Sequence, residues 1–538
     1  MKAVGLLLLS ACSAWASGTA SWEMTSYQDF IKGKFQGVSL SRDGRLALAP
    51  KLVTVFLSGQ PVIWSLAEGP DGSLYAGTGH RGKLFRIDPS GGSTLLWTAE
   101  QSEIFAVAVD PKGIVYAATS PDGKIYRIEN GKASEYFAPK AKYIWTLALA
   151  PDGALYAGTG DDGKVFRITA PGQGEEYYAT GQGHVTSLSI DTQGRLLAGT
   201  EPNGVLYRVS AKDKAFVLYD ANLPEIRAIA NAEDGSVYAV ALGGSLSKKT
   251  QSATQPVQGG PGSGTVPSVT TSITVTAESA QSGNAEVKVI PDPAKQAAPA
   301  PAVTTAAAVS TQVIDLTGVE KSALYKIHPD NTVETLWSSK EENIYDVLAL
   351  PGQIMFSTDG NGRIYRLSPD RKLTLVAQTN EAEATRLLRS RDTVLAATGN
   401  MGKIYRLGDA GSSGTYESPV FDAQGPARWG RLAWRGELPS GKITLRTRSG
   451  NGLRPDRTWS DWSEPLTANA GVQIPSPNAR YIQWKAEMTG GQPVLENVSV
   501  AYLPQNSAPT VKSITVITQL SSAAPAKPAS SSASSAYS

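Results

Sequence analysis

The chain has 538 residues, and its 50 Lys and Arg residues nearly balance its 48 Asp and Glu residues. This balance argues against the strongly basic surface that nucleic-acid binding requires, so we expect no nucleic-acid partner. The length allows a large core and more than one domain. The 53 glycines and the many aromatic residues favour short strands joined by tight turns.

The N-terminus reads as a secretory signal, with a basic start at Lys2 and an apolar stretch over residues 3–11. Cleavage after Ala16 would make residues 1–16 a signal peptide. A lipobox ending at Cys12, the only cysteine, would make residues 1–11 the signal and put a lipid anchor on Cys12. We expect an exported protein that is periplasmic, anchored to the outer membrane or secreted, with no transmembrane segment.

One pattern of about forty residues recurs along the chain. Successive units begin 40 or 41 residues apart, except for one step of 118 residues. Each unit holds four short alternating segments separated by tight turns, which is typical of a four-stranded propeller blade rather than of helices. The openings are Ile63-Trp64, Ile104-Phe105, Ile144-Trp145, Val185-Thr186, Ile226-Arg227, Ile344-Tyr345 and Ala384-Thr385.

Seven openings predict an all-β fold with a seven-bladed β-propeller over residues 37–413. The seventh unit lacks a clear fourth strand, and we expect residues 51–56 to supply it, because this closure would remove an exposed edge. Residues 37–48 are predicted to form an extra hairpin that turns at Asp43-Gly44.

The blade pattern resembles the WD40/YVTN-like propellers and the sensor propellers of bacterial two-component proteins, although WD dipeptides are absent. The layout is similar to exported acidobacterial propeller proteins of unknown function. The parallels are Trp22-Glu23, Asp29-Phe30, residues 37–40 and residues 322–325. This resemblance implies an architecture and no chemistry.

Two segments have the composition of disordered chain, because they hold too few apolar residues to fold alone. Residues 245–322 interrupt blade five between its second and third strands and are rich in Ser, Thr, Ala and Pro. The insertion is either a tolerated loop expansion, which we favour, or a partner-binding arm. Residues 504–538 form the second segment, a C-terminal tail.

Residues 414–503 lose the repeat but keep strand-like segments, which predict a small antiparallel β-sandwich. It resembles galactose-binding-like or fibronectin-type modules. Residues 459–463, Trp-Ser-Asp-Trp-Ser, resemble the W-S-x-W-S box of cytokine receptors, in which tryptophans interleave with arginines. The resemblance implies a structural cation–π contact with Arg446 or Arg448. Carbohydrate stacking on Trp459 or Trp462 is the less favoured alternative.

Two sets of residues are candidates for ligand binding. The first set holds the second place of the innermost strands and would either line the channel mouth and stack a ligand or, as we favour, pack between blades. It comprises Trp64, Phe105, Trp145, Arg227 and Tyr345. The second set lies in turns and would either form an acidic ring for Ca²⁺ or a basic ligand, or simply suit turn geometry, which we favour. It comprises Asp122, Asp161, Asp162, Glu201 and Asp359.

No sequence pattern identifies catalytic chemistry, and we expect no obligatory cofactor. The matches to G-x-G-x-x-G at residues 77–82 and 158–163 precede strands, so they are not dinucleotide sites. His80 and His184 would either share a site or, as we favour, be unrelated. We therefore expect a non-catalytic binding or scaffolding protein with a protein or glycan partner. The alternative is a lactonase-like or lyase-like propeller enzyme that acts on sugars.

Overall fold

The computed structural model describes residues 19–129, 131–243 and 320–505. The expected signal peptide and Cys12, nearly all of the insertion and the tail beyond residue 505 lie outside these ranges. The described residues contain one helix, α1 (Tyr27–Phe30). This helix is too short to cross a membrane. The rest of the regular structure is β-strand, which confirms the all-β class.

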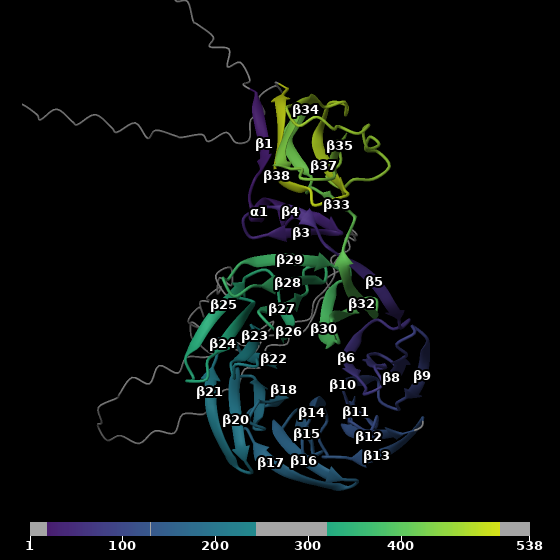
Figure 1. Ribbon diagram of the computed structural model, residues 1–538, viewed down its shortest axis with the longest axis vertical. Helices are drawn as coiled ribbons and strands as arrows, with labels where there is room; N and C mark the ends of the chain where they lie inside the picture. Colours follow the sequence, from purple (N-terminus) through teal and green to yellow (C-terminus); the bar gives the residue numbers. More distant parts are fainter. Residues whose placement is uncertain (1–18, 130, 244–319, 506–538) are drawn as a thin grey trace, which may run out of the picture.

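Six of the expected blades are separate four-stranded antiparallel sheets arranged in a ring (Figure 1). The first two blades consist of β6 (Ile63–Glu68), β7 (Leu74–Thr78), β8 (Lys83–Ile87) and β9 (Ser93–Thr98), and of β10 (Glu103–Val109), β11 (Val115–Ser120), β12 (Lys124–Glu129) and β13 (Lys132–Phe137). The next three consist of β14 (Ile144–Leu149), β15 (Leu155–Thr159), β16 (Lys164–Ala170) and β17 (Gln173–Ala179); of β18 (His184–Ile190), β19 (Leu196–Glu201), β20 (Val205–Ala211) and β21 (Lys214–Asp220); and of β22 (Glu225–Asn231), β23 (Val237–Leu242), β24 (Ser322–Ile327) and β25 (Val333–Ser339). The last of the six consists of β30 (Glu383–Ser390), β31 (Thr393–Gly399), β32 (Lys403–Ala410) and β5 (Pro50–Leu57).

The expected count of seven separate blades needs correction. Strands β26 (Ile344–Leu350), β27 (Gln353–Thr358), β28 (Arg363–Leu367) and β29 (Leu373–Gln378) pair in the same order as a blade. They do not form a sheet of their own, because the outer edge of β29 continues into a fourteen-stranded sheet. The periodic sequence specifies the four strands but carries no sign of what pairs with their outer edge.

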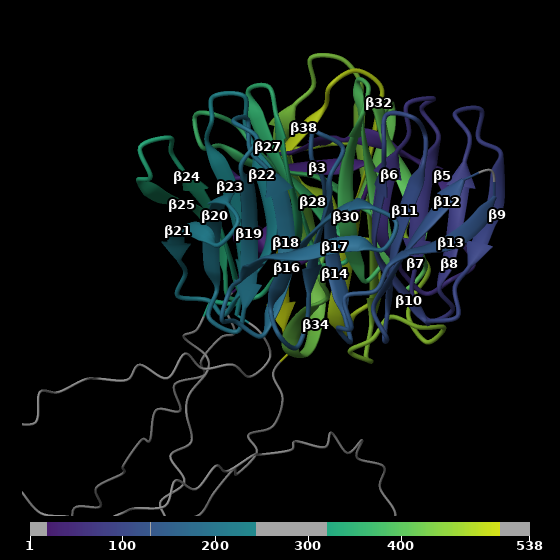
Figure 2. The same ribbon diagram turned by 90° about the horizontal axis from the view of Figure 1, so that it is seen from below.

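The ring closes as expected. The innermost strands contact one another in the circuit β6, β10, β14, β18, β22, β26, β30 and back to β6. Strand β5 pairs with β32 with Phe56 opposite Ile404, so the N-terminal segment completes the last blade and removes its exposed edge. Figure 2 shows the ring from the side, with the strands running between its two faces. The insertion leaves between β23 and β24, the second and third strands of blade five, as predicted.

The predicted hairpin is present, and it pairs with the C-terminal sheet region as well as with the propeller. Strands β3 (Val38–Ser41) and β4 (Leu46–Leu48) pair with each other, and the turn contains Gly44 at φ 81. Strand β3 pairs with β29 of the ring, and β4 pairs with β38 (Val494–Pro504). The hairpin therefore joins the ring to the C-terminal sheet region in one continuous sheet.

The C-terminal sheet region contains strands from both ends of the described chain. Its C-terminal strands are β33 (Ser413–Glu417), β34 (Phe421–Glu437), β35 (Lys442–Gly450), β36 (Val472–Gln473), β37 (Ala479–Thr489) and β38. Strand β1 (Ala20–Met24) pairs with β38, and β2 (Lys34–Gln36) pairs with β33. We call β1, β2 and β33–β38 the terminal unit. The expected boundary of 414–503 missed β1 and β2, because these short strands lie outside the repeat and find partners only far along the chain. Whether the unit is galactose-binding-like or fibronectin-type stays a prediction.

The core of the terminal unit is aromatic. Trp429, Trp484 and Tyr416 are almost completely buried. Phe30 from α1 packs edge-on against Tyr416 and Trp484, with ring centroids 5.7 and 6.5 Å apart. Each such side chain removes a large apolar area from water, so the N-terminal segment is held by burial as well as by strand pairing.

The Trp-Ser-Asp-Trp-Ser segment has the interleaved structure that its resemblance implied. The Arg448 guanidinium lies 5.8 Å from the Trp459 ring and 4.3 Å from the Trp462 ring, and Lys485 lies 5.0 Å from the Trp462 ring. Arg446 instead donates to the Ser463 carbonyl at 2.9 Å. Because cations already contact these rings, the contacts favour a structural role over carbohydrate stacking.

Candidate functional site

A bulge interrupts the innermost strand of every repeat at the same place. Pairing with the next strand skips the residue after the opening Ile, Val or Ala. An extra residue of this kind bends the strand and re-aims a side chain. The seven bulged residues are Trp64, Phe105, Trp145, Thr186, Arg227, Tyr345 and Thr385. They include all five of the predicted ligand-binding residues, although the sequence showed only the repeat and not the bulge.

The bulges lie at one end of the ring, beside the turns between second and third strands. The Gly79 N–H donates to the Val62 carbonyl at 3.1 Å, just before the bulge at Trp64. In another blade, the Gly160 N–H donates to the Tyr143 carbonyl at 2.9 Å in the same way. We call this end of the ring the mouth.

Three bulged aromatic residues from consecutive blades form a continuous arc. The ring centroids of Trp64 and Phe105 are 5.8 Å apart, and those of Phe105 and Trp145 are 4.8 Å apart. Tyr143 stacks on Trp145 at 4.9 Å. All four side chains are partly exposed, so these residues pack against one another across blades and still present surface at the mouth.

Hydrogen bonds hold the two indoles of this arc. The Trp64 Nε1–H donates to Glu103 at 2.7 Å, and the other Glu103 oxygen accepts the His80 backbone N–H at 3.0 Å. The Trp145 Nε1–H donates to His184 Nδ1 at 3.2 Å. The polar edges of the indoles are therefore satisfied by the protein. His80 and His184 lie in blades three repeats apart and serve these separate contacts, so they do not share a site.

Charged groups continue the mouth beyond the aromatic arc. The Arg227 guanidinium lies 5.7 Å from the Tyr345 ring and 3.3 Å from Glu225. Burial raises the pKa of the Tyr345 hydroxyl, and the Glu383 carboxylate raises it further. Burial and the Glu225 carboxylate together raise the pKa of Glu201, although His184 and Arg227 act in the opposite direction.

A charged pair lies beside the bulges, at the third place of two innermost strands. The Asp346 carboxylate accepts the Leu387 N–H at 2.8 Å and lies 3.7 Å from the Arg386 guanidinium. Arg386 also donates from Nε to the Trp64 carbonyl at 3.1 Å, so the pair links three blades. Burial raises the pKa of Asp346 and lowers the pKa of Arg386. Sequence reasoning missed this pair, although the other repeats have Ser, Thr or Ala at this place.

The predicted acidic ring is not assembled into a cation site in the structure. Asp122, Asp161 and Asp162 are exposed in their turns, and Asp122 and Asp161 have φ of 60° and 71°. Asp359 accepts hydrogen bonds from Asn343 at 2.9 and 2.7 Å. Across residues 19–129, 131–243 and 320–505, no three His, Cys, Asp or Glu side chains are grouped to hold a metal ion.

No protein-family model matches the chain, and no curated protein matches it by sequence. Among solved structures, it is similar to the virginiamycin B lyase of Staphylococcus aureus, with a TM-score of 0.48, 12% identity, and coverage of 66% of this chain and 98% of that chain. It is similar to the WD40 β-propeller domain of Doa1, with a TM-score of 0.44, 10% identity, and coverage of 66% and 97%. It is also similar to the structure of YCF48 bound to D1 peptide, with a TM-score of 0.44, 9% identity, and coverage of 67% of this chain and 96% of that chain. The propeller assignment rests on the pairing of the chain's own strands.

Proposed function

We propose that this chain is a non-catalytic binding protein of the bacterial cell envelope or secretome, and that its mouth takes a basic segment of a partner protein. The observation that carries this proposal is the aromatic arc of Trp64, Phe105 and Trp145. The envelope location rests on the signal-type sequence of residues 1–16.

Carboxylates lie at the same end of the ring as the arc, and Asp122, Asp161 and Asp162 are exposed in their turns. We call six of them the rim carboxylates: Glu103, Asp122, Asp161, Asp162, Glu201 and Asp359. No ion pair involves any of the six in the described part of the chain, where the adjacent Glu225 is the partner of Arg227. A lysine or arginine side chain gains a cation–π contact of about 0.5–2 kcal/mol over an aromatic ring, and nearby carboxylates add attraction.

The proposal is tested by fluorescence anisotropy of the whole chain with a labelled Lys-Gly repeat peptide and a Glu-Gly repeat of the same length. We expect only the basic peptide to bind. Its affinity should fall as the salt concentration rises, because salt screens the attraction between charges. Phe105→Ala should weaken binding at least tenfold. Phe216→Ala is the control, because Phe216 lies on the outer strand β21 and is 56% exposed. Equal binding of both peptides, or no effect of Phe105→Ala, would contradict the proposal.

A propeller enzyme acting on sugars is the second candidate, and one observation favours it. His184 lies opposite Glu201 across the β18–β19 pair, and together with Arg227 of the adjacent blade it opposes the rise in the pKa of Glu201 that burial and Glu225 cause. The three side chains supply an acid–base pair and a cation at the mouth, as a lyase-type elimination needs. Release of an unsaturated product from uronic-acid polymers, lost in His184→Ala, would support this candidate against the binding protein.

A further inference from the structure

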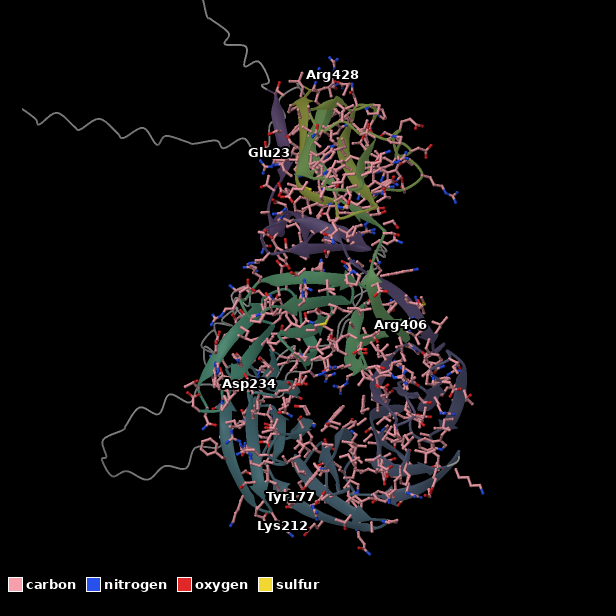
Figure 3. All side chains as sticks on the ribbon, in the orientation of Figure 1. Glu23, Tyr177, Lys212, Asp234, Arg406 and Arg428 are labelled. Atoms are coloured by element: carbon pink, nitrogen blue, oxygen red, sulfur yellow. The ribbon has the colours of Figure 1, made fainter. Side chains whose placement is uncertain are left out.

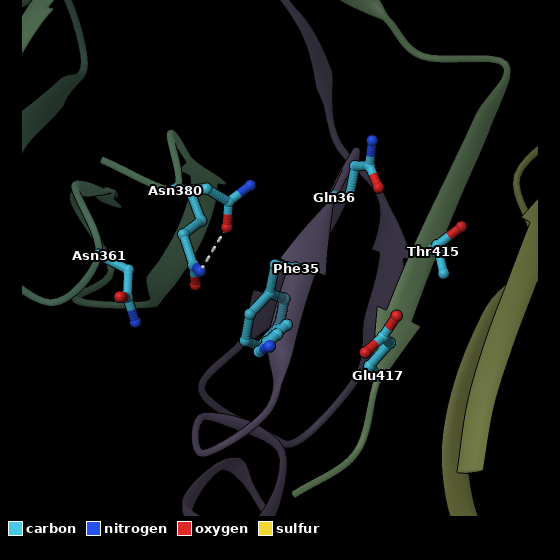
Figure 4. Close-up of a pocket in the computed structure, with 8 residues that line it drawn as sticks. Phe35, Gln36, Asn361, Asn380, Thr415 and Glu417 are labelled. Atoms are coloured by element: carbon cyan, nitrogen blue, oxygen red, sulfur yellow. Dashed lines mark hydrogen bonds between the residues drawn. The ribbon is translucent and has the colours of Figure 1, made fainter. Parts of the chain in front are cut away.

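The strand path divides where the ring meets the terminal unit, and a cavity lies in the division. After β2 the chain turns at Gly37 and enters β3. Strand β3 follows the edge of β29 in the ring, whereas β2 pairs with β33 of the terminal unit. The cavity between them has a volume of about 390 Å³, and we call it the fork cavity (Figure 4). Its lining residues are Lys34, Phe35, Gln36, Asn361, Gln378, Asn380, Thr415 and Glu417.

Polar side chains of the terminal unit form one wall. Lys34 lies opposite Glu417 across the β2–β33 pair, and Gln36 lies opposite Thr415. Alternate residues of a strand point to the same side, so these four side chains share one face. The opposite charges of Lys34 and Glu417 balance, which leaves an amide and a hydroxyl as the neutral polar groups of this wall.

Three carboxamides of the ring form the other wall. Asn361 lies in the turn between β27 and β28 with φ of 60°, and Gln378 ends β29. The Gln378 Nε2–H donates to Asn380 Oδ1 at 2.9 Å (Figure 4). Gln378 is 6% exposed, and its buried Oε1 has no hydrogen-bond partner among the residues that the structure describes. Leaving such an acceptor unpaired is unfavourable, so a donor that enters the cavity would be stabilised there.

The two walls are held at a fixed separation. Strand β3 pairs with β29 at Leu40 and Leu375 next to the cavity. Arg363 of β28 donates from Nη2 to the Ile31 carbonyl at 2.6 Å, which ties the N-terminal segment to the ring. A site that is already formed before binding loses less entropy when a ligand enters.

We propose that the fork cavity binds a neutral polyhydroxylated ligand, a monosaccharide or a disaccharide. A carboxamide offers donors and an acceptor side by side, and a sugar hydroxyl also donates and accepts. The balanced charges of Lys34 and Glu417 favour a ligand without net charge. The volume lies in the range of about 300–1,000 Å³ that small-molecule sites occupy.

The experiment is isothermal titration calorimetry of the whole chain with glucose, galactose, N-acetylglucosamine and cellobiose, and with glucose 6-phosphate as the charged comparison. We expect at least one neutral sugar to bind at one site per chain, and the phosphate ester to bind at least tenfold more weakly than glucose. Absence of binding by every neutral sugar, or tighter binding of the phosphate ester, would overturn the proposal.

Variants assign the binding to the cavity. Asn361→Gly removes a carboxamide while glycine accepts the positive φ, so the fold is retained. We expect Asn361→Gly and Gln378→Met each to weaken sugar binding tenfold or more. Asn400→Gly is the matched control, because Asn400 has φ of 72° in the corresponding turn of the next blade and does not line the cavity. Unchanged sugar binding by Asn361→Gly would overturn the assignment.

The sugar site and the proposed function fail independently. Phe105→Ala alters the mouth and should weaken binding of the basic peptide at least tenfold without changing sugar binding. Gln378→Met, at the end of the outer strand β29, should have the reverse effect.

Discussion

The ring and the terminal unit are built by opposite kinds of strand pairing. In the ring, nearly every strand pairs with its neighbour along the chain, and β5 with β32 is the exception that closes the circle. In the terminal unit, β1 pairs with β38 so that Ala20 lies opposite Tyr502. Local pairing follows from a repeat of strands and turns, whereas distant pairing must bring together two chain ends that are separated by the whole ring, which costs more loop-closure entropy. The two regions should therefore respond differently to core substitutions.

Contacts between blades also differ around the ring. Between several blades, a small hydroxyl side chain donates to a carbonyl of the next blade. Ser65 donates to Ile104 at 3.3 Å, Ser187 to Ile226 at 2.9 Å and Thr385 to Ile63 at 2.6 Å. Between the innermost strands β26 and β30, the charged pair of Asp346 and Arg386 takes the place of a hydroxyl contact. Removing one hydroxyl contact costs the fold little stability. Removing one partner of a charged pair costs more, because the other partner is then a buried charge without compensation.

The largest expected effect is Trp484→Ala in the terminal unit. Trp484 is fully buried, so the substitution should destabilise the unit by about 3–5 kcal/mol through lost burial and a cavity. Hydrogen exchange should show faster exchange in β1, β37 and β38, with β14 and β15 still protected. Leu453→Ala is the control, because Leu453 is 63% exposed. Equal loss of protection in both regions would show that they unfold as one unit.

A smaller effect is expected for Arg386→Met in the ring. Removing the guanidinium takes away the cation that lies 3.7 Å from the buried Asp346 carboxylate, on which Arg227 acts as well. We expect a loss of about 2–4 kcal/mol in denaturant unfolding. Adding Asp346→Asn should restore part of that stability, because it removes the stranded charge. The exposed Arg389→Met serves as the control and should change little, since Arg389 donates to the backbone carbonyl of Arg391. If the double variant is no more stable than the single one, the pair is not the cause.

The smallest effect is expected for Glu201→Gln, and it depends on pH. The folded-state pKa of Glu201 is raised above its ordinary value of 4.5, so folding favours the protonated form. The contribution of Glu201 to the free energy of unfolding is fully present below pH 4.5 and is lost as the pH rises through the raised folded-state pKa. The variant should gain a few tenths of a kcal/mol, about the size expected for a partly exposed group, at neutral pH and nothing at acidic pH. Thermal unfolding across this pH range measures the gain, and an equal gain at every pH would refute the electrostatic cause.

The sequence by itself determined the ring. The recurring openings from Ile63 to Ala384, the alternation within each segment and the turns between them specify strands that pair locally, and the missing last strand pointed to β5. The resemblance of residues 459–463 also anticipated the contact of Arg448 with both tryptophans. Apart from the distant pairing of β5 with β32, these features lie in short stretches of chain, where the pattern of residues dictates the local structure.

Tertiary structure alone decided the sites. The repeat places Trp64, Phe105 and Trp145 at equivalent positions of three units, but only the shared bulge and the ring bring their side chains into one arc. The fork cavity likewise needs Gln36, Gln378 and Thr415 from three separate segments. The placement of β1 and β2 was missed for the same reason, because a short strand outside a repeat carries no local sign of a partner hundreds of residues away.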